Sequence, residues 1–401
     1  MKNLSIKNIS ITLIVSYFFI IGGFIVNGQS KPLQIRIDPD NTYGGKISDF
    51  FERVEFIKLD SKKESIFGNI SQLEATKDRF IIYDNDTRSI LIFNHHGEFI
   101  AKIKPRSSEE FFGSFTLDRK LSHILLNISG NKFLTYDYDG KFIDETQVTL
   151  RYERIFKLSN GYYALNSPRN LTKTKKDSMS NDLIFSSDLK SVSKYYFPYN
   201  TKHQGYDYNL PLPIFSDQGN NTFFYSFPYS YSIFEMDSDG IIQEYNFVFS
   251  EKYSLPMGFG TDSLFSKQRK EYIFNPDHEN LDKYTFIGPT YKISNYLIFH
   301  VEKISNRIFS QNSDFIHNLQ TGITFSLNKL KGDSISDYLP VLQTSYRQNF
   351  KSFYDGFLYS TMPSAAYNAM IKNLNIQSDT LQIKNLNNND NPIIIKIKIK
   401  K

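Results

Sequence analysis

A short motif that recurs along the chain constrains its fold more than any other feature. An apolar residue, a polar turn closed by Gly and an apolar restart occur as FNHHGEFI at 93–100, YDYDGKFI at 136–143 and MDSDGII at 236–242. Weaker copies stand at 185–189 and 317–322. The Gly supplies the positive φ that a tight β-hairpin demands. The chain is therefore expected to consist of repeated antiparallel hairpins.

The residues around the first copy extend the hairpin to four strands. Runs rich in Ile, Phe and Tyr cover 70–75, 79–83, 89–93 and 98–103, with polar turns between them. Four short antiparallel strands in one such segment are typical of a β-propeller blade. Further units are recognisable at 118–149, 155–198, 220–250 and 284–328, and 355–386 with the C-terminal tail makes a sixth.

The fold class follows from this count. The sequence predicts an all-β fold, a six-bladed β-propeller of four-stranded antiparallel blades, as one domain over 29–401. Gly240 and Gly322 are too far apart for one blade, and the charged run at 267–271 between them predicts a short helical insertion over about 262–284.

The two ends of the chain are expected to close the ring. From Ile395 onward isoleucine alternates with lysine, which is the period of a strand with one dry face. Residues 54–59 are the natural N-terminal partner for this strand. The alternative is a basic tail for a membrane surface, but lysines along one face of a strand are more often a solvated edge that blocks aggregation.

The N-terminus has the parts of a secretory signal peptide. Lys2 and Lys7 precede an apolar stretch at 9–26, and Gly28 offers a small-residue cleavage site. We expect residues 1–28 to be removed on export to the periplasm or cell envelope, or on secretion. An uncleaved anchor is the alternative. The chain has no Cys to carry a lipid, so a lipoprotein is not expected.

The composition excludes several kinds of site. The chain contains 36 Phe and 27 Tyr but neither Cys nor Trp, so it can form no disulfide, thiolate metal site or cysteine nucleophile. The aromatic excess favours strands. A net charge of +5 is small for 401 residues and does not suggest a nucleic-acid partner. No cofactor is expected, and we expect a monomer.

The chain resembles the exported six-bladed β-propellers of Bacteroidetes, a family with NHL-like blades. The resemblance rests on VEFIKLD at 54–60, the end of the first blade at 90–100, and NDNPIII at 389–395. After the first blade this family usually has a Gly-rich segment ending in Gly-Pro-Gly-Glu-Tyr, where the present chain has KPRSSEEF at 104–111. Only Glu110 and Phe111 match its end, so a close backbone approach to a ligand is in doubt here. The resemblance implies no catalytic residues.

Other motifs favour structural over chemical interpretations. The Asp-x-Asp-Gly runs at 137–140 and 237–240 lack the Glu that a calcium loop needs, so hairpin turns are favoured. His95 and His96 are adjacent and point apart, and Ser191 to Lys194 matches an acylating Ser-x-x-Lys pattern on a predicted strand rather than a helix. No catalytic or metal-binding residue is predicted.

One aromatic group has no blade to explain it. Phe223, Tyr225 and Phe227 fit strands that fill the core between blades. In contrast, Tyr199, Tyr206 and Tyr208 lie with His203 in a loop that no strand pattern claims. Exposed loop aromatics beside polar groups suit sugar or peptide recognition, although an aromatic loop packed over a blade edge is the plainer alternative. The predicted ligand-binding residues are Tyr199, His203, Tyr206, Tyr208, Glu110 and Phe111.

The sequence thus predicts a binding or scaffold protein that recognises a glycan, a peptide or an envelope protein through one face of the ring. The candidate loops are 104–116, 198–215 and 251–290. The alternative is a propeller enzyme, a polysaccharide lyase or hydrolase with its site at the central channel. Convergent carboxylates, histidines or arginines in the channel would favour chemistry, and a plain or plugged channel would favour binding. A membrane-tethered partner of an outer-membrane complex is a third possibility.

Overall fold

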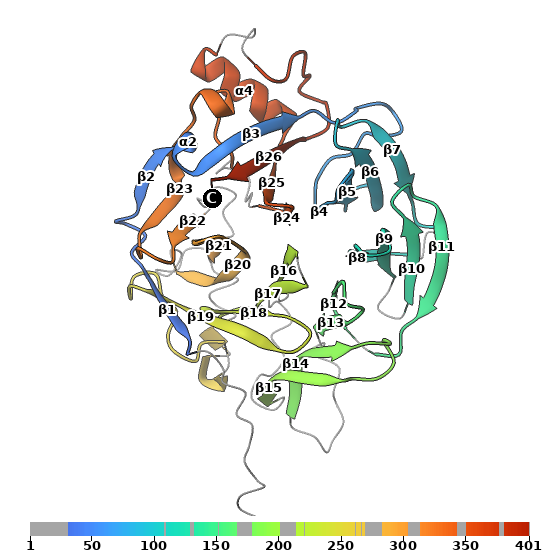
Figure 1. Cartoon of the computed structure of the whole chain (residues 1–401), viewed down its shortest axis with the longest axis vertical. Helices are drawn as coiled ribbons and strands as arrows, with labels where there is room; N and C mark the ends of the chain where they lie inside the picture. Colours follow the sequence, from blue (N-terminus) through green and yellow to red (C-terminus); the bar gives the residue numbers. More distant parts are fainter. Residues whose placement is uncertain are drawn as a thin grey trace, which may run out of the picture.

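Six β-sheets form a ring around a central channel (Figure 1). The computed structural model describes residues 31–107, 110–128, 132–150, 152–166, 179–200, 214–219, 221–260, 262–265, 267–268, 283–303, 313–342, 350–376 and 381–400. Within these residues each sheet has four antiparallel strands, and two of the sheets carry one further parallel strand. The prediction of an all-β, six-bladed β-propeller is confirmed.

The blades follow one another in chain order, with the innermost strand first. Blade 1 contains β4 (Gln72–Ala75), β5 (Arg79–Asp84), β6 (Ser89–Asn94) and β7 (Phe99–Ile103). Blade 2 contains β8 (Phe112–Asp118), β9 (His123–Ile128), β10 (Lys132–Asp137) and β11 (Phe142–Gln147). Blade 3 contains β12 (Arg154–Lys157), β13 (Tyr163–Asn166), β14 (Met179–Ser186) and β15 (Lys194–Asn200).

The second half of the ring is completed by the N-terminal strands. Blade 4 contains β16 (Ile214–Gly219), β17 (Thr222–Ser226), β18 (Ser232–Met236) and β19 (Ile241–Phe249). Blade 5 contains β20 (Tyr284–Ile293), β21 (Tyr296–Lys303), β22 (Ser313–Asn318) and β23 (Thr324–Lys331). Blade 6 contains β24 (Ser352–Tyr354), β25 (Phe357–Met362), β26 (Ile393–Ile399) and, from the other end of the chain, β3 (Phe51–Ile57).

Blades 2 and 4 begin earlier than the sequence suggested. Their first strands, β8 and β16, precede the expected starts at 118 and 220. Both strands contain small or polar residues, Gly113 and Ser114 in β8 and Asp217 to Gly219 in β16, that resemble a turn. Inner strands line the channel, so they tolerate polar residues that strands in the core between blades do not.

The recurrent motif forms the hairpin between the third and fourth strands of a blade. Gly97, Gly140, Gly240 and Gly322 all have positive φ, between 71° and 148°. In each hairpin the Asn or Asp that opens the turn accepts backbone N–H hydrogen bonds. Asp137 Oδ1, for example, accepts from the amides of Asp139 and Lys141 at 3.0 and 2.8 Å. These contacts confirm the hairpin interpretation of the Asp-x-Asp-Gly runs.

The ring is closed by antiparallel pairing of β26 with β3, as the sequence predicted. Ile397 faces Val54 and Ile395 faces Phe56 in this register. The expected solvated edge is wrong, because β3 covers the outer side of β26. Lys396 and Lys398 instead lie 3.5 and 3.1 Å from the carboxylates of Glu55 and Glu52 on β3.

The chain before β3 follows the outer edge of the ring, a feature that the sequence analysis missed. β1 (Leu33–Ile37) adds to β19 of blade 4, and β2 (Tyr43–Lys46) adds to β23 of blade 5, both in parallel. Strands β1, β2 and β3 therefore bind the outer edges of three successive blades (Figure 1). Parallel strands from a distant part of the chain leave no hairpin signal in the sequence.

The helices are few and short in the described residues. Helix α4 (Ser364–Leu374) lies between β25 and β26, where the sequence suggested only a blade, and buried Tyr367 meets the ring of Phe56 at 5.7 Å. Short helical turns occur at α2 (Ile47–Phe50), η1 (Ser263–Phe265) and η2 (Ser334–Ser336). The expected helical insertion at 262–284 falls largely outside the described residues. None of the described helices is long and apolar enough to cross a membrane.

Strand direction gives the ring two different faces. In each blade, the turn from the innermost strand to the second and the turn from the third strand to the fourth lie at the same end, which we call the hairpin face. The turn from the second strand to the third lies at the other end, which we call the loop face. The crossings from the outermost strand of one blade to the innermost strand of the next also lie at the loop face. The loop-face crossings are 58–71, 104–111, 148–153, 201–213, 250–283 and 332–351. The described residues 104–107, 110–111, 251–260 and 262–265 of the candidate loops 104–116 and 251–290 therefore belong to the loop face, whereas 112–116 and 284–290 lie in β8 and β20. Most of the candidate loop 198–215 lies outside the described residues.

Gly97 provides a test of how tightly the last hairpin of blade 1 packs against residues 58–60, which follow β3. A Cβ at Gly97 would lie 1.9 Å from the carbonyl oxygen of Lys58, and the Gly97 carbonyl accepts from the Asp60 amide at 2.8 Å. Gly322 has a similar φ but no atom within 4 Å of such a Cβ. Gly322→Ala should cost about 1–2 kcal/mol through backbone strain alone. Gly97→Ala should cost clearly more, measured by urea unfolding, and equal costs would contradict this packing.

Candidate functional site

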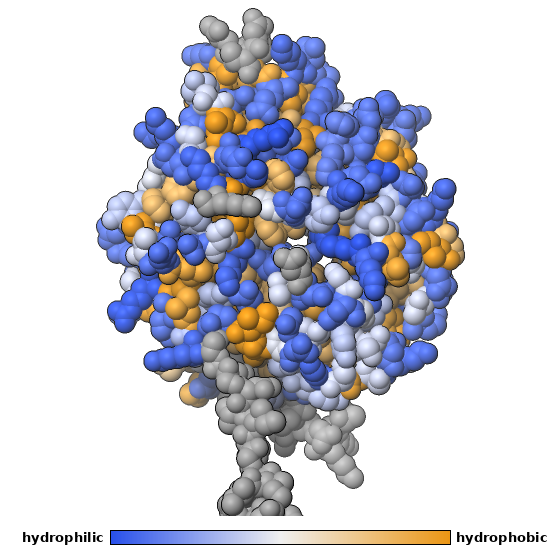
Figure 2. All heavy atoms as spheres, viewed as in Figure 1, coloured by the Kyte–Doolittle hydropathy of each residue, from blue (hydrophilic) through white to orange (hydrophobic). Residues whose placement is uncertain are grey.

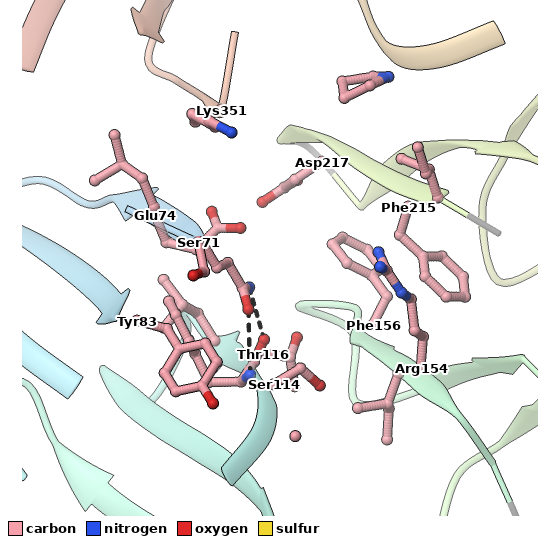
Figure 3. A pocket seen from close by; sticks show the side chains of 18 of the residues that line it. Ser71, Glu74, Tyr83, Ser114, Thr116, Arg154, Phe156, Phe215, Asp217 and Lys351 are labelled. Atoms are coloured by element: carbon pink, nitrogen blue, oxygen red, sulfur yellow. Dashed lines mark hydrogen bonds between the residues drawn. The ribbon is translucent and has the colours of Figure 1, made fainter. Parts of the chain in front are cut away.

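The inner strands of the six blades surround a polar cavity of about 410 Å³ in the channel. In the space-filling view a narrow opening lies at the centre of the ring, and hydrophilic side chains border much of it (Figure 2). Figure 3 shows Glu74, Asp217 and Lys351 directed into the cavity, with Arg154 beside Phe156 and Phe215. The polar lining residues include Ser71, Gln72, Glu74, Tyr83, Ser114, Thr116, Arg119, Glu153, Arg154, Asp217, Tyr291 and Lys351.

Arg119 lies at the hairpin-face end of this cavity. It follows β8, and its Nε lies 2.9 Å from an Asp217 carboxylate oxygen while one terminal nitrogen lies 3.1 Å from Glu74. The other terminal nitrogen donates to the Ala75 carbonyl at 2.8 Å. Glu74 is on blade 1 and Asp217 is on blade 4, and these two blades face each other across the ring of six blades. One guanidinium therefore joins opposite sides of the channel.

The carboxyl group of Glu74 has an unusual proton affinity. Burial raises its pKa to about 7, with Arg119 opposing the rise and Asp217 adding to it. The three side chains are still 15–20% exposed, so water in the channel reaches them. A carboxyl group with a pKa near neutrality can hold or release a proton under physiological conditions.

Side-chain amides fix the inner strands relative to one another. The Gln72 amide donates to the Phe115 carbonyl at 2.9 Å and accepts from the Phe115 amide at 3.3 Å, which joins blades 1 and 2. Gln218 makes the same kind of bridge between blades 4 and 5, to the carbonyl of Thr290 and the amide of Lys292. Inner strands share no backbone ladder, so these bridges help to set the width of the channel.

Two cations lie at the loop-face end of the cavity. Arg154 begins β12 on blade 3, and Lys351 directly precedes β24 on blade 6. Neither side chain has an ion pair or a hydrogen bond to any part of the chain that the structure describes. Burial lowers the pKa of both groups, and the neighbouring carboxylates offset this only in part. The two side chains are half-buried and therefore partly desolvated, and no described carboxylate is in direct contact with either of them.

An aromatic wall stands beside Arg154. The rings of Phe156 and Phe215 lie 6.0 Å apart and are nearly parallel, with an interplanar angle of 12°. Both residues line the cavity and also pack against Phe223 in the core between blades 3 and 4. The cavity thus combines charged groups at its two ends with an apolar side.

The structure describes three of the six predicted site residues. Tyr199 lies in β15, where its backbone pairs with Ser180, while His203, Tyr206 and Tyr208 lie outside the described residues, so their role stays a prediction. Glu110 accepts two hydrogen bonds from the Arg106 side chain, at 3.1 and 2.9 Å, and one from its amide. Phe111 is exposed, with Arg88 above its ring at 5.7 Å.

The channel residues were missed because no local pattern marks them. Glu74, Arg119, Arg154, Asp217 and Lys351 are scattered charged residues in the sequence, each on or next to the first strand of a blade. Exact blade boundaries would have exposed them, since a charge in an inner strand must face the channel. In the described part of the chain, His, Asp and Glu side chains form no group of three that could hold a metal ion.

Replacing Arg119 tests its role in holding the channel. At pH 7 Arg119→Met leaves the Asp217 carboxylate without its counter-charge and removes a hydrogen-bond donor from Glu74, whose raised pKa lets it take up a proton. We therefore expect a loss of about 3–5 kcal/mol in the free energy of unfolding. The control Arg53→Met removes an exposed ion pair with Glu55 and should cost less than about 1 kcal/mol. Urea unfolding followed by far-UV circular dichroism suits a chain without Trp. Equal losses of unfolding free energy in the two variants would show that the contacts of Arg119 with Glu74 and Asp217 do not stabilise the ring.

The raised pKa of Glu74 predicts a pH dependence. The folded protein holds a proton on Glu74 up to about pH 7, whereas the ordinary pKa is 4.5. Its contribution to stability is therefore full below about pH 4.5 and is lost as the pH rises through about 7. Compared with Glu74→Gln, the wild type should lose thermal stability steadily from pH 4.5 to 8. Glu52→Gln, at an exposed carboxylate, should run parallel to the wild type. If the melting temperatures of Glu74→Gln and the wild type changed in parallel with pH, the raised pKa of Glu74 would be contradicted.

Comparison with known proteins places this chain in a family. No protein with a curated description matches it in sequence. A protein of Bacteroides fragilis that is described as exported has the same fold at 18% identity, with a TM-score of 0.68 over 92% of this chain and 100% of that one. A Bacteroides vulgatus member of the DUF4221 family aligns at 13% identity, with a TM-score of 0.51 over 87% and 99% of the two chains. The domain-of-unknown-function family DUF4934 matches residues 34–398, and the chain belongs to this family.

Proposed function

We propose that this protein is an exported binding or scaffold protein that recognises a glycan, a peptide or an envelope-protein partner through its loop face. The proposal rests on the observation that large apolar side chains are exposed at the loop face. Met257 and Leu264, on one loop-face crossing, are 97% and 82% exposed. Exposed apolar residues in the described crossings are Ile66, Phe111, Met257, Leu264 and Tyr338, whereas the described turns of the hairpin face expose Leu121 and Ile323.

The crossing with Met257 is held on a firm base. Phe259 packs edge-on against Tyr229 at 5.3 Å, and Phe265 lies 5.6 Å from Phe259. Met257 and Leu264 flank these packed rings and point away from them into solvent. Apolar side chains presented on a packed base are suited to a partner surface, because little conformational entropy is lost on binding.

Two features support export. Residues 1–28 have the composition of a signal peptide, and the similar protein of Bacteroides fragilis is called exported. In this proposal the mature chain works in the periplasm or cell envelope as a monomer. In a monomer, no second copy of the chain would cover the loop face, so a partner could bind there.

A photo-crosslinking residue in place of Met257 tests the loop face. The full mature chain, incubated with envelope extract and applied to a glycan array, should crosslink one partner or bind one glycan class reproducibly. The same residue in place of Leu121 is the matched control on the hairpin face and should give no product. Equal crosslinking at both positions, or no partner and no glycan, would reject the proposal.

A second candidate is a polysaccharide lyase or hydrolase with its site in the channel. Glu74, Asp217 and Arg119 converge there, and a carboxyl group with a pKa near 7 suits general acid catalysis. Binding remains the better-supported function, because Arg119 engages both carboxylates and joins them across the ring. Polysaccharide cleavage by the wild type that Glu74→Gln abolishes would favour the enzyme.

A further inference from the structure

The loop-face end of the channel contains two cations that form no ion pair with any residue that the structure describes. Arg154 and Lys351 come from blades 3 and 6, which face each other across the ring. The two side chains therefore enter the cavity from opposite sides. A half-buried cation without a partner is costly, and proteins keep such groups mainly where a ligand supplies the counter-charge.

The other charges near the cavity do not cancel these cations. Asp217 and Glu74 are engaged by Arg119 at the opposite end. Asp314 acts on Lys351 through its charge, but the Asp314 carboxylate lies 3.0 Å from the His300 ring. Burial lowers the pKa of His300, and the pairing with Asp314 outweighs burial and raises this pKa to about 10. Glu153 and Glu302 act on Arg154 and Lys351 through their charges, but they offset the effect of burial on the pKa of each cation only in part. Among the described residues, neither carboxylate forms an ion pair with these cations.

The cavity also has the size and the surface of a small-molecule site. Its volume of about 410 Å³ lies within the range of about 300–1,000 Å³ found for ligand pockets. Phe156 and Phe215 give it an apolar side next to Arg154, and Ser71, Ser114 and Thr116 contribute hydroxyl groups. A compact organic acid could place its charge between the two cations and its carbon skeleton against the aromatic wall.

We propose that the central channel is a binding site for a small organic anion, whose carboxylate or phosphate is held between Arg154 and Lys351. An arginine fork binds either group with two parallel hydrogen bonds, and a lysine adds a point charge. The site is separate from the exposed apolar residues of the loop face, so it does not depend on the function proposed above. The inference concerns the chemical class of the ligand, an acid of about monosaccharide size.

Calorimetry on the purified mature protein tests this site directly. The probes are glucuronate, glucose 6-phosphate, inorganic phosphate and neutral glucose. At least one anion should bind, and glucose should bind at least about tenfold more weakly, because charge-assisted hydrogen bonds are worth about 1.5–3 kcal/mol. Glucuronate alone would identify a carboxylate site, and glucose 6-phosphate or phosphate alone a phosphate site. No binding of any anion at about 10 mM, or equal binding of glucose, would overturn the proposal.

Charge-neutral variants separate a ligand site from a structural role. Arg154→Gln combined with Lys351→Gln should weaken anion binding at least about tenfold. The same double change at exposed Arg36 and Lys77 matches the loss of net charge and should leave binding within about twofold. The channel variant should keep or raise the melting temperature, because it removes two desolvated charges. A lower melting temperature with unchanged anion binding would overturn the proposal.

Discussion

The pairing of β26 with β3 is the interaction on which the rest of the structure depends. It joins residues from the two ends of the chain in one sheet, and Ile393, Ile395 and Ile397 of β26 are fully buried by it. The channel residues come from blades 1, 2, 3, 4 and 6, so their distances are defined only when the ring is closed. β1 and β2 extend the same closing segment around blades 4 and 5, which makes opening the ring more costly than breaking a single sheet.

Aromatic packing takes the place of covalent links in this ring. With no Cys in the chain, the blades are held by side chains that interdigitate between sheets, among them a cluster of aromatic rings between blades 3 and 4. Phe223 and Tyr225 are fully buried there, and Tyr225 donates to the Asp182 carboxylate at 2.6 Å. Phe156 and Phe215 belong both to this core and to the wall of the channel. The cavity is therefore shaped by the same contacts that stabilise the fold.

The two ends of the channel treat charge in opposite ways. At the hairpin face all three nitrogens of the Arg119 guanidinium contact protein groups, so this cation has a structural role. At the loop face Arg154 and Lys351 have no such partner in the described chain. The cation that is paired with carboxylates and the two cations that are not therefore lie at different ends of the channel of this DUF4934 protein, and the unpaired cations lie on the side of the long connections.

The sequence by itself determined the blades, their hairpins and the closure, because these depend on local signals: a Gly with positive φ at 97, an Asp or Asn at each turn, and alternation from Ile395 to Ile399. It did not determine β1 and β2, which pair in parallel with distant strands, or helix α4. Nor did it find Glu74, Arg119, Arg154, Asp217 and Lys351. Each is an ordinary charged residue in its local sequence, and only the closed ring brings them within a few ångströms of one cavity.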